Sequence, residues 1–374
     1  MKSAFVAVLM ALGTSTMPRA DVSLDKEGKL LLQGGFTFRL ESDWDSHDAA
    51  GVGRNDRNRA RVRARLGLRY DLSANVSFGV RVRTGVEPSQ QSQFITVLDS
   101  DSGAVSENDF IWDKYYVTAK KGGAWATAGR ENFPFWTQNE LFWDNDVTPA
   151  GVSSGYRFKT GRHHLDVTGA YVALPDGSTR LAGDLAAGQI VYGLDDGWWS
   201  MTTALGIFHF NGSPGAVNLL HGNGARDYGI WVGGAQLKLP TGYRPITFGV
   251  DFMHNGERYS ENDPDPFTRA HRGHRDGYVL SAIYGWLKMP GDWQVSYYHA
   301  RIEALAVNSS YAQDDWARWG TATQGDSSDL KGSEFRGTVK LGRNLSMMAR
   351  YYFVQAITSP QDGKRFRVDF IVEL

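Results

Sequence analysis

The sequence contains no cysteine, which excludes a disulfide framework and any metal site built on thiolates. It also carries little net charge, −1 at pH 7, and so gives no reason to expect nucleic acid as a partner. Beyond the first twenty residues, no run approaches the ~18 consecutive apolar residues of a membrane-spanning helix. No His-Glu-x-x-His or P-loop pattern is present. The sequence therefore lacks these two catalytic motifs, and we expect neither an enzyme nor a cofactor.

Glycine and aromatic residues are abundant instead. The chain of 374 residues has 43 glycines and 12 tryptophans, and 13% of its residues are aromatic. Glycine serves turns and crowded strand positions, and aromatic residues form the girdles of membrane β-barrels. The mean hydropathy of −0.38 taken alone would suggest a soluble protein. A transmembrane β-barrel, however, places its apolar side chains at every second position, which an average does not detect.

The first twenty residues form a segment of their own. Lys2 is followed by an apolar stretch over residues 4–12, and Ala20 precedes the acidic Asp21. This is the layout of a secretory signal peptide. We therefore expect residues 1–20 to be a cleaved signal peptide and residues 21–374 to be a single-domain mature chain.

The mature chain repeats a period-two alternation in segments of about ten residues, as half-buried strands do. In the last segment Phe366, Val368 and Phe370 alternate with Arg367 and Asp369. The same pattern recurs in residues 36–40, 60–70, 76–86, 246–252, 278–286, 335–341 and 345–353.

Short and long connections take turns between these segments. The short ones are residues 71–75, 120–123, 161–162, 195–197, 240–245, 289–292 and 342–344. The others, mostly long and polar, are residues 43–56, 87–109, 131–151, 175–184, 211–227, 255–276, 307–331 and 359–363. Alternating periplasmic turns and extracellular loops are typical of outer-membrane proteins. The pattern predicts an all-β fold, a transmembrane antiparallel up-and-down β-barrel of about sixteen strands.

Two neighbouring segments carry a row of arginines between their apolar residues. With apolar side chains facing lipid, the lumen receives Arg61, Arg63, Arg65, Arg69, Arg81 and Arg83. If the turn at residues 71–75 pairs Tyr70 with Val76, Arg65 lies opposite Arg81 and Arg63 opposite Arg83. Like charges in such positions are unfavourable in a dry interior. We therefore expect these arginines to line a water-filled pore.

The connection after the fifth strand, residues 131–151, is unusually aromatic for a polar loop. A loop that stayed in water would have little use for five large aromatic residues. We expect it to fold inward, bury its aromatic residues on the inner wall, and present its acids to the arginines as a pore constriction. The alternative is an ordinary extracellular loop. The candidate constriction residues are Glu131, Phe133, Trp136, Glu140, Trp143, Asp144 and Asp146.

The stretch from Arg59 to Tyr156 resembles the putative porin family of Gram-negative outer membranes. The matching pieces are Arg-Leu-Gly-Leu at 65–68, Val-Arg-Thr-Gly at 82–85, Asp-Lys-Tyr-Tyr at 113–116, Gly129-Arg130 leading to Phe-Pro-Phe at 133–135, and residues 141–151. Two features depart from the family pattern: Ala150 stands where Glu is usual, and Leu374 where barrels of this kind usually end in an aromatic residue. The resemblance implies an outer-membrane location, contact with lipid and with the barrel-assembly machinery, and, by analogy, a homotrimer.

We therefore expect a porin, a passive diffusion channel for small hydrophilic solutes. The arginine row would concentrate anions and so favours an anion preference. A polyanion exporter or a barrel that encloses a partner protein remains an alternative, and so does an outer-membrane hydrolase using His209 or His299.

Metal sites are weaker candidates. His163 and His164 are adjacent on a strand and point to opposite faces. His271 with His274 could hold a transition metal, and two acidic sets could take Ca²⁺ through oxygen ligands. These sets are Glu261, Asp263 and Asp265, and Asp144 with Asp146. Plain loops are the simpler interpretation of all of them, and we expect no metal.

Overall fold

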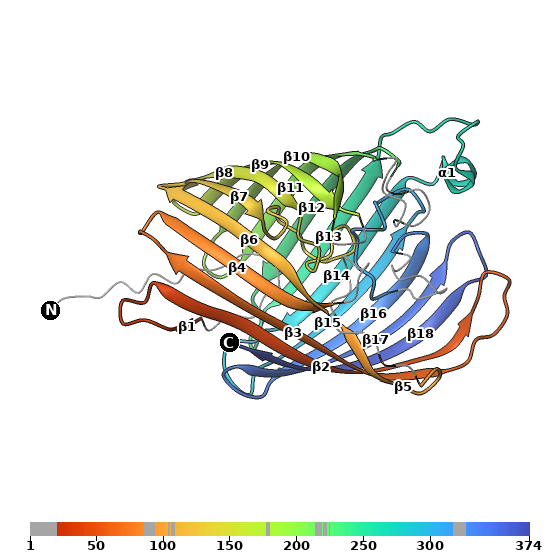
Figure 1. The fold of residues 1–374 in the computed structure, drawn as a ribbon, viewed down its shortest axis with the longest axis horizontal. Coiled ribbons are helices and arrows are strands. Elements are labelled where there is room, and N and C mark those ends of the chain that lie inside the picture. Colours follow the sequence, from red (N-terminus) through yellow and green to blue (C-terminus); the bar gives the residue numbers. More distant parts are fainter. Residues whose placement is uncertain are drawn as a thin grey trace.

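The computed structural model describes residues 21–85, 94–103, 105, 109–176, 180–213, 219, 223, 225–316 and 327–374. The expected signal peptide, residues 1–20, lies outside this range and stays a prediction. The described chain forms one closed β-barrel (Figure 1).

The strands are all joined in one antiparallel sheet. Their bounds are β1 (Val22–Ser23), β2 (Leu30–His47), β3 (Arg57–Asp71), β4 (Val76–Gly85), β5 (Ile95–Asp99), β6 (Asp109–Lys121), β7 (Ala124–Arg130), β8 (Ala150–Thr160), β9 (His163–Pro175), β10 (Leu181–Asp195), β11 (Ser200–Asn211), β12 (Tyr228–Leu239), β13 (Ile246–Asn255), β14 (Asp276–Gly285), β15 (Trp293–Ile302), β16 (Leu330–Lys340), β17 (Leu345–Ala356) and β18 (Asp362–Glu373).

Two of these strands add no width to the wall. The stub β1 pairs with β2 just beyond the point where β18 ends, because Val22 lies opposite Leu32 and Glu373 opposite Gly35. In the same way β5 continues the line of β4, since both pair with β3. The remaining strands form a ring of sixteen that closes where β2 pairs with β18. The predicted barrel of about sixteen strands is confirmed.

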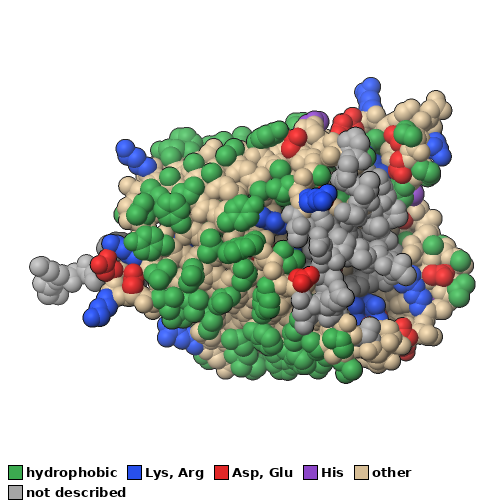
Figure 2. All heavy atoms as spheres, in the orientation of Figure 1, with side chains coloured by type: hydrophobic (Ala, Val, Ile, Leu, Met, Phe, Trp, Pro, Cys, Tyr) green, Lys and Arg blue, Asp and Glu red, His purple; other side chains and the backbone are tan. Residues whose placement is uncertain are grey.

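Apolar side chains cover the outside of the wall (Figure 2). Exposed members come from every part of the ring, for example Leu66 on β3, Ile190 on β10, Phe252 on β13 and Phe335 on β16. In Figure 2 the charged side chains gather mostly towards the two ends of the barrel. An apolar band with polar ends is the surface that a lipid bilayer requires.

The connections differ from the prediction at two places. The predicted loop 87–109 contains a strand, β5, which pairs with β3 through Val62 opposite Ile95. The loop 255–276 contains α1 (Pro266–His271), which Asp265 caps by accepting the N–H of Thr268 at 2.7 Å. This cap and the proline in its first turn explain a helix that the alternation could not reveal. No helix among the described residues is long and apolar enough to cross a membrane.

Candidate functional site

A large cavity of about 1740 Å³ lies inside the barrel. Ligand pockets usually measure about 300–1,000 Å³, so the volume of this cavity exceeds that of a typical pocket for one small molecule. Its lining comes from strands on all sides of the ring, including Arg63 on β3, Thr168 on β9, Gln294 on β15 and Asp369 on β18.

The predicted arginines separate into two groups. Arg63, Arg65, Arg69 and Arg81 line the cavity. Arg61 and Arg83 are buried, with only 4% and 3% of their surface exposed, and do not border the cavity. The Arg61 guanidinium donates to the carbonyl of Phe94 at 3.0 Å.

The register between β3 and β4 differs from the prediction by two residues. Arg65 lies opposite Arg83, and Arg81 lies opposite Gly67, because the last pair before the turn is Asp71 with Ser77 and not Tyr70 with Val76, so that the turn lies one residue further along the chain. A Cβ on Gly67 would come within 3.3 Å of the Arg81 side chain, so the glycine makes room for it. The expected alignment of Arg65 with Arg81 and of Arg63 with Arg83 was wrong.

A β-bulge supplies the counter-charge for β4. The pairing of β4 with β6 shifts between Arg81, opposite Lys114, and Val82, opposite Trp112, so Asp113 is the extra residue. A bulge turns two successive side chains to one face, and both Asp113 and Lys114 are buried. Asp113 accepts a hydrogen bond from Arg81 at 2.5 Å and lies 3.3 Å from Nε of Arg83. The sequence analysis did not select Asp113. The sequence nevertheless carries a sign of the bulge, because the large apolar residues stand two apart at Phe110 and Trp112 but three apart at Trp112 and Tyr115.

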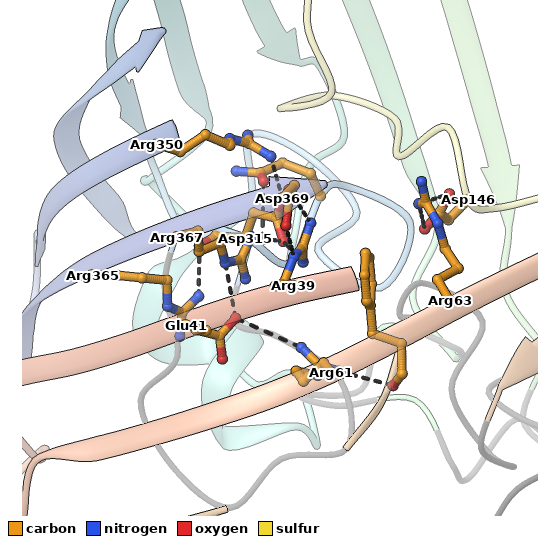
Figure 3. A network of polar contacts seen from close by, with 12 residues as sticks. Arg39, Glu41, Arg61, Arg63, Asp146, Asp315, Arg350, Arg365, Arg367 and Asp369 are labelled. Carbon is orange, nitrogen blue, oxygen red and sulfur yellow. Dashed lines mark hydrogen bonds and ion pairs between the residues drawn. The ribbon is translucent and has the colours of Figure 1, made fainter. Parts of the chain in front are cut away.

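A second arginine cluster lies on the neighbouring strands β2, β17 and β18 (Figure 3). Arg39 pairs with Asp369 at 2.7 Å, and Arg367 pairs with Glu41 at 2.8 Å. Glu41 also contacts Arg59 and lies 3.8 Å from Arg61. The sequence analysis did not select this cluster as functional, although the alternation at residues 365–369 already placed two arginines and an aspartate on the inward face.

The aromatic loop, residues 131–149, packs on the strands across the cavity from these arginines. It begins after Gly129, whose φ of 119° and 2.2 Å approach of an added Cβ to the Tyr115 carbonyl exclude other residues. Trp136 donates its backbone N–H to Gln189 of β10 at 2.8 Å. Gln138 donates to Asp251 of β13 at 2.7 Å.

The aromatic side chains of this loop form a cluster with β11. Trp143, only 1% exposed, stacks on Phe133 at 4.1 Å between ring centroids, and Phe142 lies 4.7 Å from Phe208. Phe133 and Trp136 also border the cavity, whereas Trp143 does not.

The acids of the aromatic loop have different partners. Asp146 lies 3.3 Å from Nη1 of Arg63 and also contacts Arg65. Glu131 pairs instead with Lys114 at 2.5 Å. Both border the cavity.

Glu140 and Asp144 accept hydrogen bonds within the loop, from the Asn145 amide and the Asp146 backbone N–H respectively, at 2.7 Å in each case. Burial, reinforced by neighbouring acids, raises the pKa of Asp144 well above its usual range, and burial also raises the pKa of Glu140.

A second loop, residues 303–316, is also buried; it includes the described start of the predicted connection 307–331. Leu305, Val307 and Tyr311 are at most 1% exposed. This loop, called here the Asp315 loop, touches the aromatic loop through backbone hydrogen bonds: Asp144 donates to the Tyr311 carbonyl at 2.7 Å, and Gln313 donates to the Glu140 carbonyl at 2.9 Å. The sequence analysis did not single out this loop, because over residues 307–331 polar side chains outnumber apolar ones.

The candidate metal residues have other partners. Asp265 caps α1 and pairs with Arg226 at 2.8 Å, and His163 contacts the Tyr192 hydroxyl at 2.7 Å. Within the part of the chain that the structure describes, no group of three His, Asp or Glu residues is arranged to hold a metal ion.

A closed sixteen-stranded antiparallel wall, an apolar exterior and a large cavity bordered by many charged side chains together define a porin-type β-barrel. Residues 39–186 match the sequence model of the family described as "Putative porin". This match confirms the resemblance inferred from residues 59–156.

Solved structures agree in fold. OprB of Pseudomonas putida, in its high-pH structure, is similar with a TM-score of 0.59 and 11% identity, over 92% of this chain and 94% of that chain. OmpT of Vibrio cholerae, in its trimer form, is similar with a TM-score of 0.51 and 9% identity, over 92% of this chain and 100% of that chain. No curated protein sequence matches the chain. The family match and the fold together support an outer-membrane porin, a channel rather than an enzyme.

Proposed function

We propose that this protein is a passive diffusion channel for small hydrophilic solutes that prefers anions, with the aromatic loop as its constriction. The observation that carries the proposal is the row of Arg63, Arg65, Arg69 and Arg81 on β3 and β4, which border the cavity. Among the described residues, these two strands contribute no acid to its lining. A wall of one charge sign raises the local concentration of the opposite ion.

The total charge of the lining alone would not give this preference, because basic and acidic side chains border the cavity in nearly equal number. What matters is which of these charged side chains are already paired with another group. Asp146 faces two arginines of β3. Asp144 and Glu140 accept hydrogen bonds from groups of the aromatic loop itself. The arginines of β3 and β4 border the cavity with no acid from the same two strands beside them, and we expect their field to be the one that a passing ion meets.

Reversal potentials across a planar bilayer under a KCl gradient test the proposal. The purified barrel is expected to favour chloride, and the triple variant Arg63→Gln, Arg65→Gln, Arg81→Gln is expected to lose that preference. Arg272→Gln is the matched control, since Arg272 lies at the end of α1 and pairs with Glu261 on the outside. Cation selectivity that the triple variant leaves unchanged would refute the anion preference. The absence of any conductance would favour a polyanion exporter or a partner-enclosing barrel.

We also propose that the barrel is a homotrimer whose signal peptide, residues 1–20, is removed on export. OmpT of Vibrio cholerae, similar in fold, is described as a trimer form. Light scattering of the detergent-solubilised protein, corrected for bound detergent, tests the assembly. N-terminal sequencing of the exported protein should begin at Asp21.

A further inference from the structure

The carboxylate of Asp315 is held by arginines from three different strands. It lies 2.8 Å from Nη1 of Arg350 on β17, contacts Nη1 of Arg367 on β18, and lies 3.7 Å from Nη1 of Arg39 on β2. Its backbone carbonyl accepts a further hydrogen bond from Arg365 at 2.7 Å. Figure 3 shows these guanidinium groups converging on the one carboxylate.

Each of the three arginines is fixed from behind by an acid of the wall. Nε of Arg39 donates to Asp369 at 2.7 Å. Nε of Arg350 donates to Glu334 at 2.7 Å, and Nε of Arg367 donates to Glu41 at 2.8 Å. Every guanidinium therefore uses its Nε for the wall and directs its Nη1 to the same point. Charged donors held in this way form a preorganised site for a carboxylate.

Asp315 itself does not belong to the wall. It is carried by the Asp315 loop, borders the cavity together with Arg39 and Arg350, and keeps 14% of its side chain exposed. Nη2 of Arg367, fully buried, has no hydrogen-bond partner among the described residues. The wall thus offers more donor capacity than the loop carboxylate uses.

Asp315 occupies this site as an anion. Burial alone would raise the pKa of Asp315, but Arg367, Arg350 and Arg39 hold it well below its usual range. A group that replaces it must therefore also be anionic and must present oxygen acceptors to several guanidinium groups.

We propose that Arg39, Arg350 and Arg367 form a binding site for the carboxylate group of a transported solute, and that Asp315 fills this site as an internal substitute ligand. A solute carboxylate binds when the Asp315 side chain turns towards the cavity, without release of the loop. Because Asp315 competes for the site, the apparent affinity for the solute is reduced in proportion to the fraction of time that the site is open. Weaker binding favours rapid release of the solute. The inference deepens the proposed anion preference and rests on it for its consequence in transport.

Thermal unfolding tests the site without transport. Asp315→Asn removes the internal carboxylate, so acetate at constant ionic strength is expected to raise the unfolding midpoint of this variant relative to chloride. Wild type and Asp314→Asn, which removes the same charge at the neighbouring position, should gain little. Adding Arg350→Gln to Asp315→Asn should abolish the gain. Equal stabilisation of all four proteins, or of none, would overturn the proposal.

If Asp315→Asn does not fold in chloride, refolding yield becomes the measurement. Recovery of folded barrel in acetate but not in chloride supports the site, and failure in both overturns it.

Block of the chloride current by succinate then links the site to transport. Succinate should block the Asp315→Asn channel at a concentration at least about tenfold below that for wild type, because the internal competitor is gone. Phosphate, with a different geometry, should show a smaller change. Acetate stabilisation in a channel without anion preference would keep the site and reject the proposed selectivity, while anion selectivity without acetate stabilisation would do the reverse.

Discussion

The two sides of the barrel interior are built on opposite physical principles. On β2, β3, β17 and β18 the inward side chains are mainly arginines and acids, and buried groups such as Glu41 and Arg367 stabilise one another as ion pairs. On β9 to β12 the inward side chains near the loops are apolar, and Phe208 and Ile230 pack beneath the aromatic loop. The comparison shows that one uniform lipid-facing exterior is compatible with two different kinds of interior surface. The charged side borders the cavity, and the apolar side anchors the aromatic loop.

The largest loss of stability is expected when a buried acid of the charged side is neutralised. Glu41→Gln would leave Arg59, Arg61 and Arg367 facing a neutral amide at a buried position. Removing one partner of a buried ion pair costs about 3–5 kcal/mol because the remaining charge is uncompensated. Urea unfolding of the refolded barrel in vesicles measures this loss. An unchanged free energy of unfolding would show that the network contributes nothing to stability.

On the apolar side, Leu141→Ala tests the anchor of the aromatic loop. Leu141 is 2% exposed and belongs to the buried cluster. We expect a loss of about 2–3 kcal/mol, the lower part of the range for such truncations, because a loop relaxes around a cavity more easily than a strand. Leu72→Ala, at a residue 54% exposed in a turn, is the control and should change little. Equal effects at the two positions would argue against a packed anchor.

Lowering the pH should make the aromatic loop on the apolar side less negative, while the arginines of the charged side keep their charge. The pKa values of Asp144 and Glu140 are raised, so these acids gain protons at a higher pH than ordinary carboxyl groups. Their loss of negative charge as pH falls should increase the anion preference measured by reversal potential. In Asp144→Asn the preference should already be high at neutral pH and respond less to acid. A preference that falls on acidification would contradict this assignment.

The smallest effect is expected outside the barrel. Arg272 and Glu261 form an ion pair at 2.9 Å, with side chains 42% and 80% exposed. Exposed pairs contribute about 0–1 kcal/mol, so Arg272→Gln should leave both the unfolding free energy and the selectivity nearly unchanged. A loss of stability as large as that of Glu41→Gln would indicate that ion pairs contribute equally inside and outside the barrel.

Much of the wall could be predicted from the sequence because lipid imposes a period of two on every strand. The alternation of Phe366, Val368 and Phe370 with Arg367 and Asp369 is such a signal. It also identified the arginines of β3 and β4. It could not set their register, which depends on the residue at which one turn begins. It also assigned loop acids as partners, whereas the bulge residue Asp113 pairs with Arg81 and Arg83.

The candidate site was harder to predict because its parts are distant in the chain. Asp315 meets Arg39 and Arg350 only after the barrel has closed and the Asp315 loop has folded back. No local pattern records such a contact. The aromatic residues of the aromatic loop, by contrast, predict burial from their composition alone, because a cluster of large apolar side chains needs a surface to cover it; Phe135, Phe142 and Trp143 are buried.

The end of β4 joins β3 through a side chain. Among the described residues, β4 and β5 supply no paired residue opposite Arg63 and Ala64, and the Thr84 hydroxyl accepts the Ala64 N–H at 3.0 Å. Along an unbroken pair such as β2 and β3, every residue of β3 from Arg57 to Tyr70 has a paired partner. Backbone pairing is open to almost any sequence, whereas this link depends on the hydroxyl of one residue. The wall beside the arginines is therefore tied to the identity of Thr84.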